Sequence, residues 1–573
     1  MADYDLIIRG GTIADGSGSP TFVGDVAVKG GKIAAVGEVA GSGAEEIDAG
    51  GKVVTPGFVD VHTHYDGQIT WEHTLAPSSG HGVTTVIMGN CGVGFAPCRA
   101  GDQEMLVKLM EGVEDVPEVV MAEGVPWNWE SFPDYLNALD QRHADIDFAA
   151  QLPHSPLRVY VMGERGAEME PPTAAELAEM RRLTAEAVKA GAIGVSSSRS
   201  LFHRFVDGTP APSVRTADDE LLTLAQGLGD AGTGVFQLIA NDQVSAAGEF
   251  DLMERVVETS GRPLSFTLVN MSSRRENWLT YLERLAQTEK AEPQIRGQFM
   301  PRPVGILFGL DLSLHPFALN PSYRPIANLP LAEKVKAMRD PELRARLLAE
   351  EPDDPNTAAV NQIKMGRQYY VLGEPANYRQ TPDQSLQAQA EARGIPLDEL
   401  VYDTLLANEG RTILYSVSTP DITRNMAEAA PLFHRPNTVV GLADGGAHYG
   451  MVCDSSYPTY ILVDWVRDGT GGEALSLELA VKSMTRDPAE LVGLRDRGVI
   501  AVGAKADLNV IDLDRLTLHR PEVVRDLPAE GRRIIQRADG YAATIVSGVV
   551  TYRNGKATGA LPGRLVRGQR AGF

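Results

Sequence analysis

The feature that most constrains the fold is an alternation of short apolar strands with amphipathic helices through the middle of the chain. Eight segments have the strand pattern: residues 58–62, 84–88, 148–152, 192–196, 235–239, 264–268, 295–299 and 438–443. Strands that alternate with helices form parallel sheets, and eight such units favour a closed (β/α)8 barrel of the TIM type. An open, doubly wound sheet is the alternative, but no Gly-x-Gly-x-x-Gly sequence follows these strands.

The helices between the strands carry clear start and stop signals. The pattern predicts a helix over residues 174–190, where Thr173 and Glu176 form a capping box and Gly191 ends the helix. Two more helices are predicted over 217–230 and near 277–286. The predicted strands are therefore joined by helices, as an α/β protein requires.

The two ends of the chain show a different pattern, in which short strands are separated by pairs of glycines. These strands are predicted at 5–9, 25–29, 32–37 and 52–54, and again at 506–512, 543–548 and 549–552. Neither end has enough strands for a stable sheet. We expect residues 1–56 and 498–573 to form one small β-sandwich domain beside a barrel made of 57–302 and 428–497. Residues 303–427 fit no single strand–helix unit and are predicted to be an insertion after the seventh strand, either a lid or a structural extension.

Composition excludes several classes of function. The 573 residues carry a formal net charge of −23, which disfavours partners such as nucleic acid and anionic membrane surfaces. Three cysteines make no disulfide framework, and no apolar run of about 18 residues is present. We expect a cytoplasmic protein that acts on a small molecule, and a homo-oligomer, because symmetric pairs are the commonest assemblies.

The strongest candidate site is the pair His62 and His64 at the end of the first predicted barrel strand. Alternate residues of a strand face the same side, so both imidazoles point together. They lie at the carboxyl end of the strand, where barrel active sites are found, and two imidazoles suit a metal ion. The alternative is a pair of core histidines satisfied by hydrogen bonds.

Two further strand ends carry candidate groups. Cys91 follows the second strand in Gly89-Asn90-Cys91-Gly92, where a thiolate would lie beside the histidines; a buried apolar cysteine is the alternative. Asp444 ends the last strand, where a carboxylate can bind a metal or act as a base, or can simply cap the next helix.

These segments resemble the N-acyl-D-amino-acid deacylase (D-aminoacylase) branch of the amidohydrolase superfamily. The similar stretches are Thr55–Asp66, which reads TPGFVDVHTHYD, Gly89–Gly92 and Asp444–His448, together with the tail segment 498–508. The resemblance implies a TIM barrel with a β-domain and metal-dependent hydrolysis of a C–N amide bond, most simply in an N-acyl amino acid. It implies that His62, His64, Cys91 and Asp444 surround zinc, and that Asp444 moves a proton from water to the leaving nitrogen.

The chain departs from that branch at three strands. Relatives have a histidine on the fifth and on the sixth strand, whereas residues 235–241 and 264–270 contain none, and the fourth strand has no lysine for a carbamylated bridge. We therefore expect one zinc ion per chain. Cyclic amide or imide hydrolysis, and a non-catalytic scaffold that kept the fold, are the alternatives. Candidate substrate-binding residues near the strand ends are Arg199, His203, Arg302 and His448.

Overall fold

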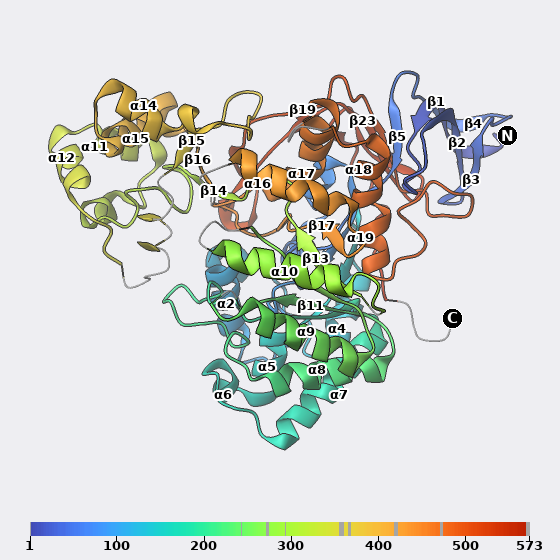
Figure 1. Cartoon of the computed structure of the whole chain (residues 1–573), viewed down its shortest axis with the longest axis horizontal. Coiled ribbons are helices and arrows are strands. Elements are labelled where there is room, and N and C mark those ends of the chain that lie inside the picture. Colours follow the sequence, from blue (N-terminus) through green and yellow to red (C-terminus); the bar gives the residue numbers. More distant parts are fainter. Residues whose placement is uncertain are drawn as a thin grey trace.

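The computed structural model describes residues 2–241, 243–270, 274–292, 294–354, 360–361, 363–364, 368–417, 422–469 and 474–568. Figure 1 shows a central region of strands covered by helices, a sheet near the amino terminus, and a separate lobe of mostly helices on the opposite side. Within the described residues, no helix is long and apolar enough to cross a membrane.

Two parallel sheets form the centre of the molecule. The larger has the order β17-β13-β12-β11-β10-β9 and the smaller the order β6-β7-β8. Their strands are β6 (Phe58–Asp60), β7 (Val83–Met88), β8 (Asp147–Ala150), β9 (Leu152–Pro153), β10 (Gly194–Ser198), β11 (Val235–Ile239), β12 (Leu264–Thr267), β13 (Ile295–Phe299) and β17 (Thr438–Val440). All eight predicted strand segments are thus found, and the third is divided into β8 and β9.

The two sheets adjoin at both of their ends. Only Gln151 separates β8 from β9, and its backbone N–H donates to the Met88 carbonyl at 2.9 Å. Beyond β6 and β17, the Asp444 N–H donates to the His62 carbonyl at 3.1 Å and the His64 N–H donates to the Gly445 carbonyl at 2.7 Å. The strand pairing itself forms two sheets rather than one continuous ring, although an isolated parallel bridge joins Thr63 to Gly445 beyond β6 and β17.

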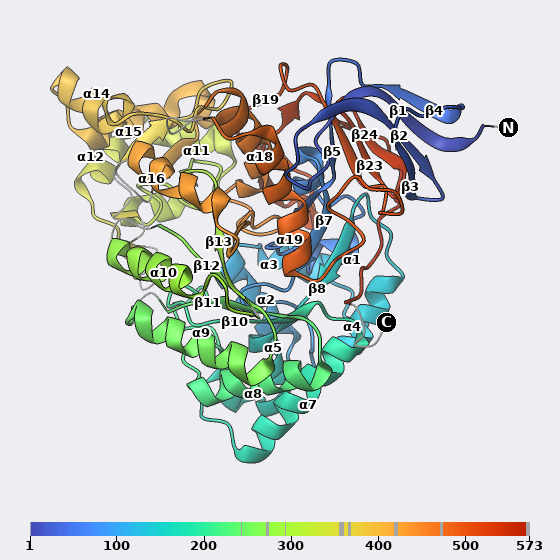
Figure 2. The same cartoon turned by 45° about the vertical axis from the view of Figure 1, so that its right-hand side comes forward.

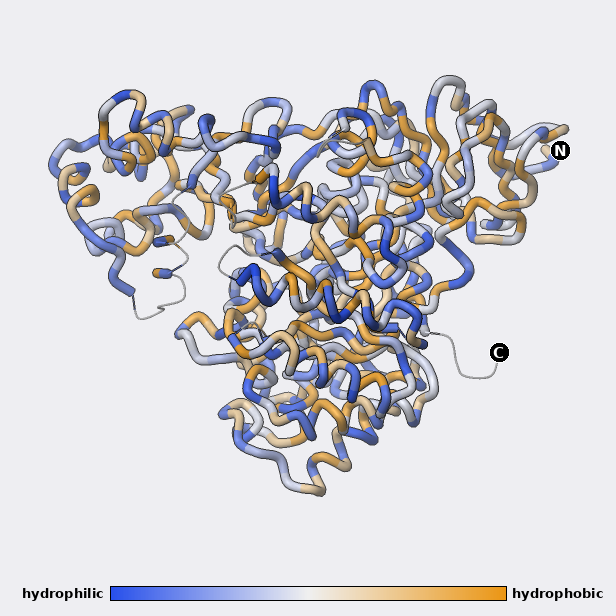
Figure 3. The backbone as a smooth tube through the Cα atoms, viewed as in Figure 1, coloured by the Kyte–Doolittle hydropathy of each residue, from blue (hydrophilic) through white to orange (hydrophobic). Residues whose placement is uncertain are grey.

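Helices cover the outside of the six-stranded sheet. They include α7 (Ala174–Ala190), α8 (Asp218–Ala231), α9 (Ala246–Ser260) and α10 (Arg275–Thr288), which pack side by side in Figures 1 and 2. The bounds predicted for α7 are confirmed, and so is its capping box between Thr173 and Glu176. In Figure 3 the outer helices alternate between hydrophilic and hydrophobic colours, as amphipathic helices on a sheet should.

Strands from both ends of the chain pair in one nine-stranded sheet. Its order is β25-β24-β23-β18-β5-β1-β2-β3, with β4 paired to β1. The strands are β1 (Tyr4–Ile13), β2 (Phe22–Lys29), β3 (Lys32–Gly37), β4 (Gly43–Asp48), β5 (Val53–Pro56), β18 (Leu508–Ile511), β23 (Tyr541–Val546), β24 (Val549–Arg553) and β25 (Lys556–Ala557). The pairing links all nine strands into a single sheet rather than the two facing sheets of the sandwich that we expected. The sheet bends at a bulge between Ile8 and Gly11 and surrounds an apolar core of its own.

The segment between β13 and α16 (Ile422–Ala429) forms the lobe at the upper left of Figure 1. It contains an antiparallel sheet of β14 (Gly305–Phe308), β15 (Tyr369–Val371) and β16 (Leu414–Val417). The helices in its described residues include α11 (Leu331–Met338), α12 (Pro341–Ala349), α14 (Leu386–Arg393) and α15 (Leu397–Leu406). This insertion has a core of its own, in which Met338 and Tyr402 are fully buried.

A second long connection lies between β7 and β8. It contains α2 (Gln103–Glu114), α3 (Glu118–Gly124) and α4 (Phe132–Asp140). Leu106 and Met110 bury the inner face of α2, and Glu114 follows them at the same helical spacing. The last turn of α2 therefore brings a carboxylate into the interior.

Candidate metal centre

His62 and His64 directly follow β6 and are almost completely buried, each with 1% of its surface exposed. A ring nitrogen of each and the Cys91 Sγ all lie within 4.8 Å of one another. It is the only cluster of three or more histidine, cysteine or acidic groups with that spacing in the described part of the chain. The two imidazoles therefore lie close together, as the alternation of side chains along a strand predicted.

A hydrogen bond between Nδ1 of His62 and Gln298 fixes the orientation of the His62 ring. Nδ1 lies 2.8 Å from Gln298 Oε1, while the Gln298 amide nitrogen donates to Ser265 Oγ at 3.0 Å. Because the amide oxygen only accepts, Nδ1 carries the proton and Nε2 presents a lone pair. Nε2 lies 3.3 Å from Cys91 Sγ and 3.4 Å from Asp444 Oδ1. This arrangement, with one nitrogen anchored and the other free, is typical of a metal-binding histidine.

A tight turn places Cys91 beside His62. Gly89 has φ 77° and so little space that a Cβ would lie 2.3 Å from the Gln151 carbonyl oxygen. At Gly92, with φ 69°, a Cβ would lie 3.0 Å from the Ser197 Cα. Both positions therefore require glycine, which explains why the cysteine is framed by this residue type.

The Cys91 thiol is protonated in the absence of a cation. Its pKa is raised well above the usual range, first by burial and then by the negative charges of Glu114 and Asp444. Metal binding displaces such a proton, because the thiolate is the ligand. A cation among these groups would offset the negative charges that now hold the proton in place.

Asp444 lies across the site from Cys91 at the end of β17. Its Oδ1 is 3.4 Å from His62 Nε2 and 3.6 Å from His64 Nε2. Burial acts to raise the pKa of Asp444, but the close contact with His64 and the neighbouring His62 and His448 outweigh it, so the pKa falls below its usual range. Its side chain keeps 23% of its surface exposed. Asp444 is thus a charged carboxylate that remains open to solvent.

The sequence did not predict Glu114, which adds a second carboxylate to the site. Its side chain is 2% exposed, and its Oε2 lies 3.5 Å from His64 Nε2 and 3.5 Å from His448 Nε2. Burial, followed by the charges of Asp444 and Asp66, raises the pKa of Glu114 well above its usual range. The available signal was its spacing: Glu114 lies four residues after Met110 and eight after Leu106, on the apolar face of the helix.

The donor set fits a metal ion. Neither ring nitrogen of His64 has a hydrogen-bond partner, although both are buried, and burial lowers the pKa of this imidazole so that it is neutral. Ligand atoms around a tetrahedral zinc ion are about 3.3–3.8 Å apart when the bonds have their usual lengths. The contacts of His62 with Cys91, and of both histidines with Asp444, fall in that range.

The four residues predicted to hold the substrate are placed differently. His203 is near the centre: its pKa is lowered to about 3, first by burial and then by interactions with His448 and His64, while Asp444 acts in the opposite direction. His448 contacts Glu114, as described above. Arg199 is instead ion-paired with Glu249 and Asp218.

Arg302 belongs to a buried network at the edge of the site. It is 2% exposed, pairs with Asp454, donates to Ser456 Oγ at 2.9 Å and stacks over the Tyr378 ring. Its Nε has no hydrogen-bond partner. Both arginines that the sequence singled out therefore already neutralise carboxylates of the protein.

Two polar strand residues that support the centre were also missed. Gln298 on β13 holds His62, and Gln237 on β11 accepts a hydrogen bond from the Cys91 backbone N–H at 3.1 Å. Each is a buried amide on a barrel strand, and its position among buried strand residues was the signal. The fifth strand thus contributes an amide that contacts Cys91.

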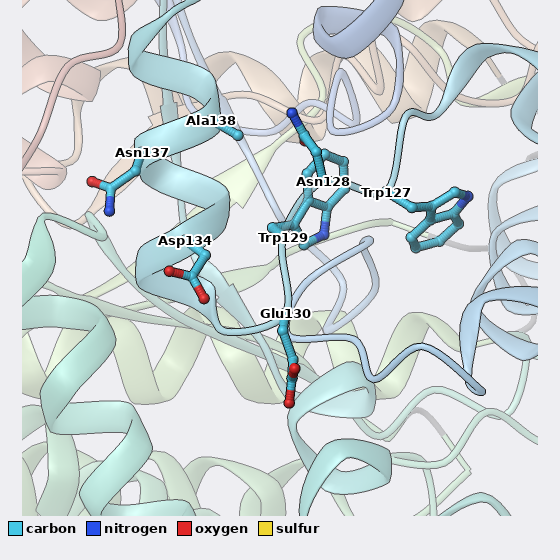
Figure 4. Close-up of a pocket in the computed structure, with 7 residues that line it drawn as sticks. All are labelled: Trp127, Asn128, Trp129, Glu130, Asp134, Asn137 and Ala138. Carbon is cyan, nitrogen blue, oxygen red and sulfur yellow. The ribbon is translucent and has the colours of Figure 1, made fainter.

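A surface depression beside α4 contains no histidine or cysteine that could bind a metal ion. Figure 4 shows its lining residues, which are Trp127, Asn128, Trp129, Glu130, Asp134, Asn137 and Ala138. None of them belongs to the histidine cluster, and none is a histidine or a cysteine. The depression therefore lacks the nitrogen and sulfur ligands of the candidate metal centre.

Comparisons with known proteins identify the family. A D-aminoacylase from Alcaligenes xylosoxydans xylosoxydans is 28% identical over 577 residues, covering 98% of this chain and 97% of its own. An N-acyl-D-aspartate deacylase from the same organism is 37% identical over 236 residues, which is 40% of this chain and 42% of its own. The structure of an N-acyl-D-glutamate deacylase from Bordetella bronchiseptica, complexed with zinc and a phosphonate inhibitor, superposes with a TM-score of 0.64 over 98% of this chain and 99% of that one, at 22% identity. The amidohydrolase family model matches residues 45–552. The chain belongs to the amidohydrolase family.

Proposed function

We propose that this protein is a metal-dependent hydrolase that cleaves the C–N amide bond of N-acyl amino acids, preferring the D-enantiomers. The observation that carries the proposal is the convergence of His62, His64 and Cys91 beside the charged carboxylate of Asp444. The names of the relatives, which are deacylases of N-acyl-D-amino acids, support this class of substrate.

The proposed architecture is a (β/α)8 barrel closed between β17 and β6. The backbone bonds that join Asp444 to His62 and His64 to Gly445 support it. We propose residues 57–302 and 428–497 as the barrel, residues 1–56 and 498–573 as a composite β-domain, and residues 303–427 as an inserted unit. The separate apolar cores of the nine-stranded sheet and of the insertion support this division.

His62, His64 and Cys91 would hold one zinc ion, because nitrogen and sulfur ligands favour this metal. When bound, the ion polarises the substrate carbonyl and makes water more acidic. Asp444 lies close enough to both histidines to accept a proton from the attacking water at a carboxylate oxygen and then deliver it to the departing nitrogen. Gln298 keeps the His62 lone pair directed inward throughout.

The groups proposed to meet the substrate are His203 and His448, which border the centre, and the Arg302 guanidinium. The unpartnered Nε supports a contact by Arg302. Arg199 would need to release Glu249 or Asp218 before it could bind a substrate carboxylate. We also propose a homo-oligomer in the cytoplasm; light scattering that gave only the 61.7 kDa of one chain would contradict the oligomer.

The test is turnover of matched N-acyl-D- and N-acyl-L-amino acids by protein whose metal content is measured. We expect about one zinc per chain, hydrolysis of D-substrates, loss of activity after chelation and recovery after zinc is restored. His62→Ala should lose both the metal and activity. Full activity in metal-free protein, or hydrolysis of cyclic imides alone, would refute the proposal.

A further inference from the structure

Glu114 is a buried carboxylate whose partners do not account for its burial. Its side chain is 2% exposed. Among the described residues, Oε1 has no hydrogen-bond partner and Oε2 has ion-pair contacts to His64 and His448, each at 3.5 Å. Both contacts are too long to be strong hydrogen bonds. No lysine or arginine pairs with Glu114 in the described part of the chain.

A carboxylate in this setting needs a compensating positive charge. Removing an ionised carboxyl group from water is costly unless it is paired or coordinates a metal. The two imidazoles are poorly placed to compensate it, since each lies 3.5 Å from Oε2 and neither approaches it as closely as a strong hydrogen bond requires. A cation bound between Glu114 and His64 would satisfy Oε1, Oε2 and the unpartnered His64 nitrogen together.

We propose that Glu114 is a direct ligand of the metal centre, which completes the set formed by His62, His64 and Cys91. The inference rests on the proposed function, because it concerns the same ion. The 3.5 Å separation of Glu114 Oε2 and His64 Nε2 matches the spacing of two ligands of one zinc ion. Glu114 comes from α2, so a helix supplies the group that no histidine of β11 or β12 provides.

This assignment separates the roles of the two carboxylates. Glu114 is closed to solvent, with 2% of its side chain exposed, as a structural ligand should be. Asp444 keeps 23% exposed, so its oxygens can reach water and substrate. The ion can then be held by four buried groups while Asp444 remains available for proton transfer.

His448 acts as a positioning residue for Glu114. Its backbone N–H donates to the Glu114 carbonyl, and its Nε2 lies 3.5 Å from Glu114 Oε2. The last turn of α2 is thus fixed at two points by one residue of the loop after β17. A ligating carboxylate usually has such a supporting group on its other side.

The first experiment measures Co²⁺ and Zn²⁺ affinity by competition with a chelator, and the visible spectrum of the Co²⁺ protein. Glu114→Gln keeps the shape of the side chain but loses its charge. We expect affinity to fall at least tenfold and the Co²⁺ bands to change in position and intensity. Glu104→Gln is the matched control, because Glu104 lies on the first turn of α2 with 74% of its side chain exposed. Unchanged affinity and an unchanged spectrum in Glu114→Gln would overturn the assignment.

The second experiment needs no variant. Crystals of the wild-type protein with zinc should show an anomalous peak about 2.0–2.2 Å from a Glu114 oxygen. A peak beside His62 and Cys91 but more than about 3.5 Å from both Glu114 oxygens would overturn the assignment and leave the proposed function standing. Wild-type protein that binds no zinc would overturn both.

Discussion

Three residues of the candidate centre adopt a backbone conformation that side chains disfavour. Cys91, Asp444 and His448 have φ of 57°, 49° and 49°. The left-handed region costs a non-glycine residue roughly 1 kcal/mol or more, and such residues gather where function requires them. Each is held by neighbours: the Cys91 N–H by Gln237, the Asp444 N–H by the His62 carbonyl, and His448 by Glu114. These backbone conformations therefore direct three side chains, from the segments after β7 and β17, toward one point.

Asp444 provides the sharpest test of the chemistry. Asp444→Asn keeps the shape and the backbone bond to His62, but an amide cannot accept the proton at a useful pKa. We expect kcat to fall by about 10²-fold or more, the range of general acid–base catalysis, while the melting temperature and most of the bound metal are retained. Steady-state kinetics with metal analysis checks this outcome. A near-normal kcat in a metal-replete variant would show that another group moves the proton.

Gln298 should influence metal affinity without touching the metal. Gln298→Leu removes the acceptor for His62 Nδ1 and frees the ring to rotate or change tautomer. Loss of such a supporting bond typically weakens metal binding 10- to 100-fold. Gln298→Glu is the matched control, since it keeps an acceptor at the same place. Equal zinc affinities for the Leu variant and the wild-type protein would contradict the role of Gln298.

The parts of the site that could be predicted are those with a local rule. His62 and His64 obey the period of a strand, and Cys91 and Asp444 follow strand ends whose positions the apolar pattern gives. Glu114 and Gln298 are polar exceptions in the apolar pattern of their own segments, and that signal does not say which site they face. They reach the centre because a helix turn and a barrel strand pack there, which depends on tertiary structure.

At the scale of elements, prediction succeeded where the signals are local. The capping box and the terminal glycine define α7 to the residue, because they are hydrogen-bonding groups of the helix itself. The strands that lead to the site are shorter than predicted: β6 ends at Asp60 and β17 at Val440. Their apolar pattern continues, but the chain turns there to present His62 and Asp444. β4 was missed because its residues 43–48 include two consecutive glutamates and little apolar alternation.

His81 joins three elements through a neutral imidazole. It ends the short helix Ser78–His81, its Nε2–H donates to the Gln536 carbonyl at 2.8 Å, and its Nδ1 lies 2.8 Å from Thr459 Oγ1. Burial lowers the pKa of His81 to about 4, below the value near 6.5 of an unfolded chain. Between these values the unfolded state binds the proton and the folded state does not, so the contribution of this group to stability is present above pH 6.5 and is lost as the pH falls.

We predict that this residue accounts for about 2 kcal/mol of the stability lost between pH 7.5 and 5. His81→Gln can keep the bond to Gln536 without titrating, so its melting temperature should be lower at pH 7.5 but should fall less toward pH 5. Thermal melts of the two proteins at both pH values measure the difference. The exposed His434 is the control, and His434→Gln should leave the pH dependence unchanged. An equal fall in wild-type and His81→Gln protein would contradict the assignment.

At the scale of the whole molecule, the loop after β17 connects parts that are distant in sequence. Within it, the Gly450 N–H donates to Asp115, the Gly450 carbonyl accepts from Ser313 of the insertion, and the Tyr449 carbonyl accepts from Ile534 near the carboxyl end. The connection after α2, the insertion and the carboxyl-terminal segment therefore all fix the loop that carries His448. The insertion contributes to the site through this support, which the sequence pattern of one segment could not reveal.

The nine-stranded sheet can form only when both ends of the chain are present. β18 pairs with β5 on one side and with β23 on the other, and Val510 at its centre is fully buried opposite Val54 and Ala543. Truncation after Arg497 would remove four strands of this sheet and expose the edge of β5. We therefore expect insoluble protein without a cooperative melt.

A matched pair of substitutions tests, in the intact chain, whether the sheet depends on its carboxyl-terminal strands. Val510→Asp places a charge in the core of the sheet without a partner, which should cost several kcal/mol and abolish soluble expression. Val549→Asp, on β24 of the same sheet, alters a residue that is 44% exposed and should change stability by no more than about 0.5 kcal/mol. Soluble yield and melting temperature distinguish the two variants. Two outcomes would contradict this dependence: a fragment of residues 1–497 that is soluble and melts cooperatively, or a Val510→Asp variant that behaves like Val549→Asp. Either result would mean that the amino-terminal strands fold without the carboxyl-terminal ones. The two ends would then be independent units rather than halves of one sheet.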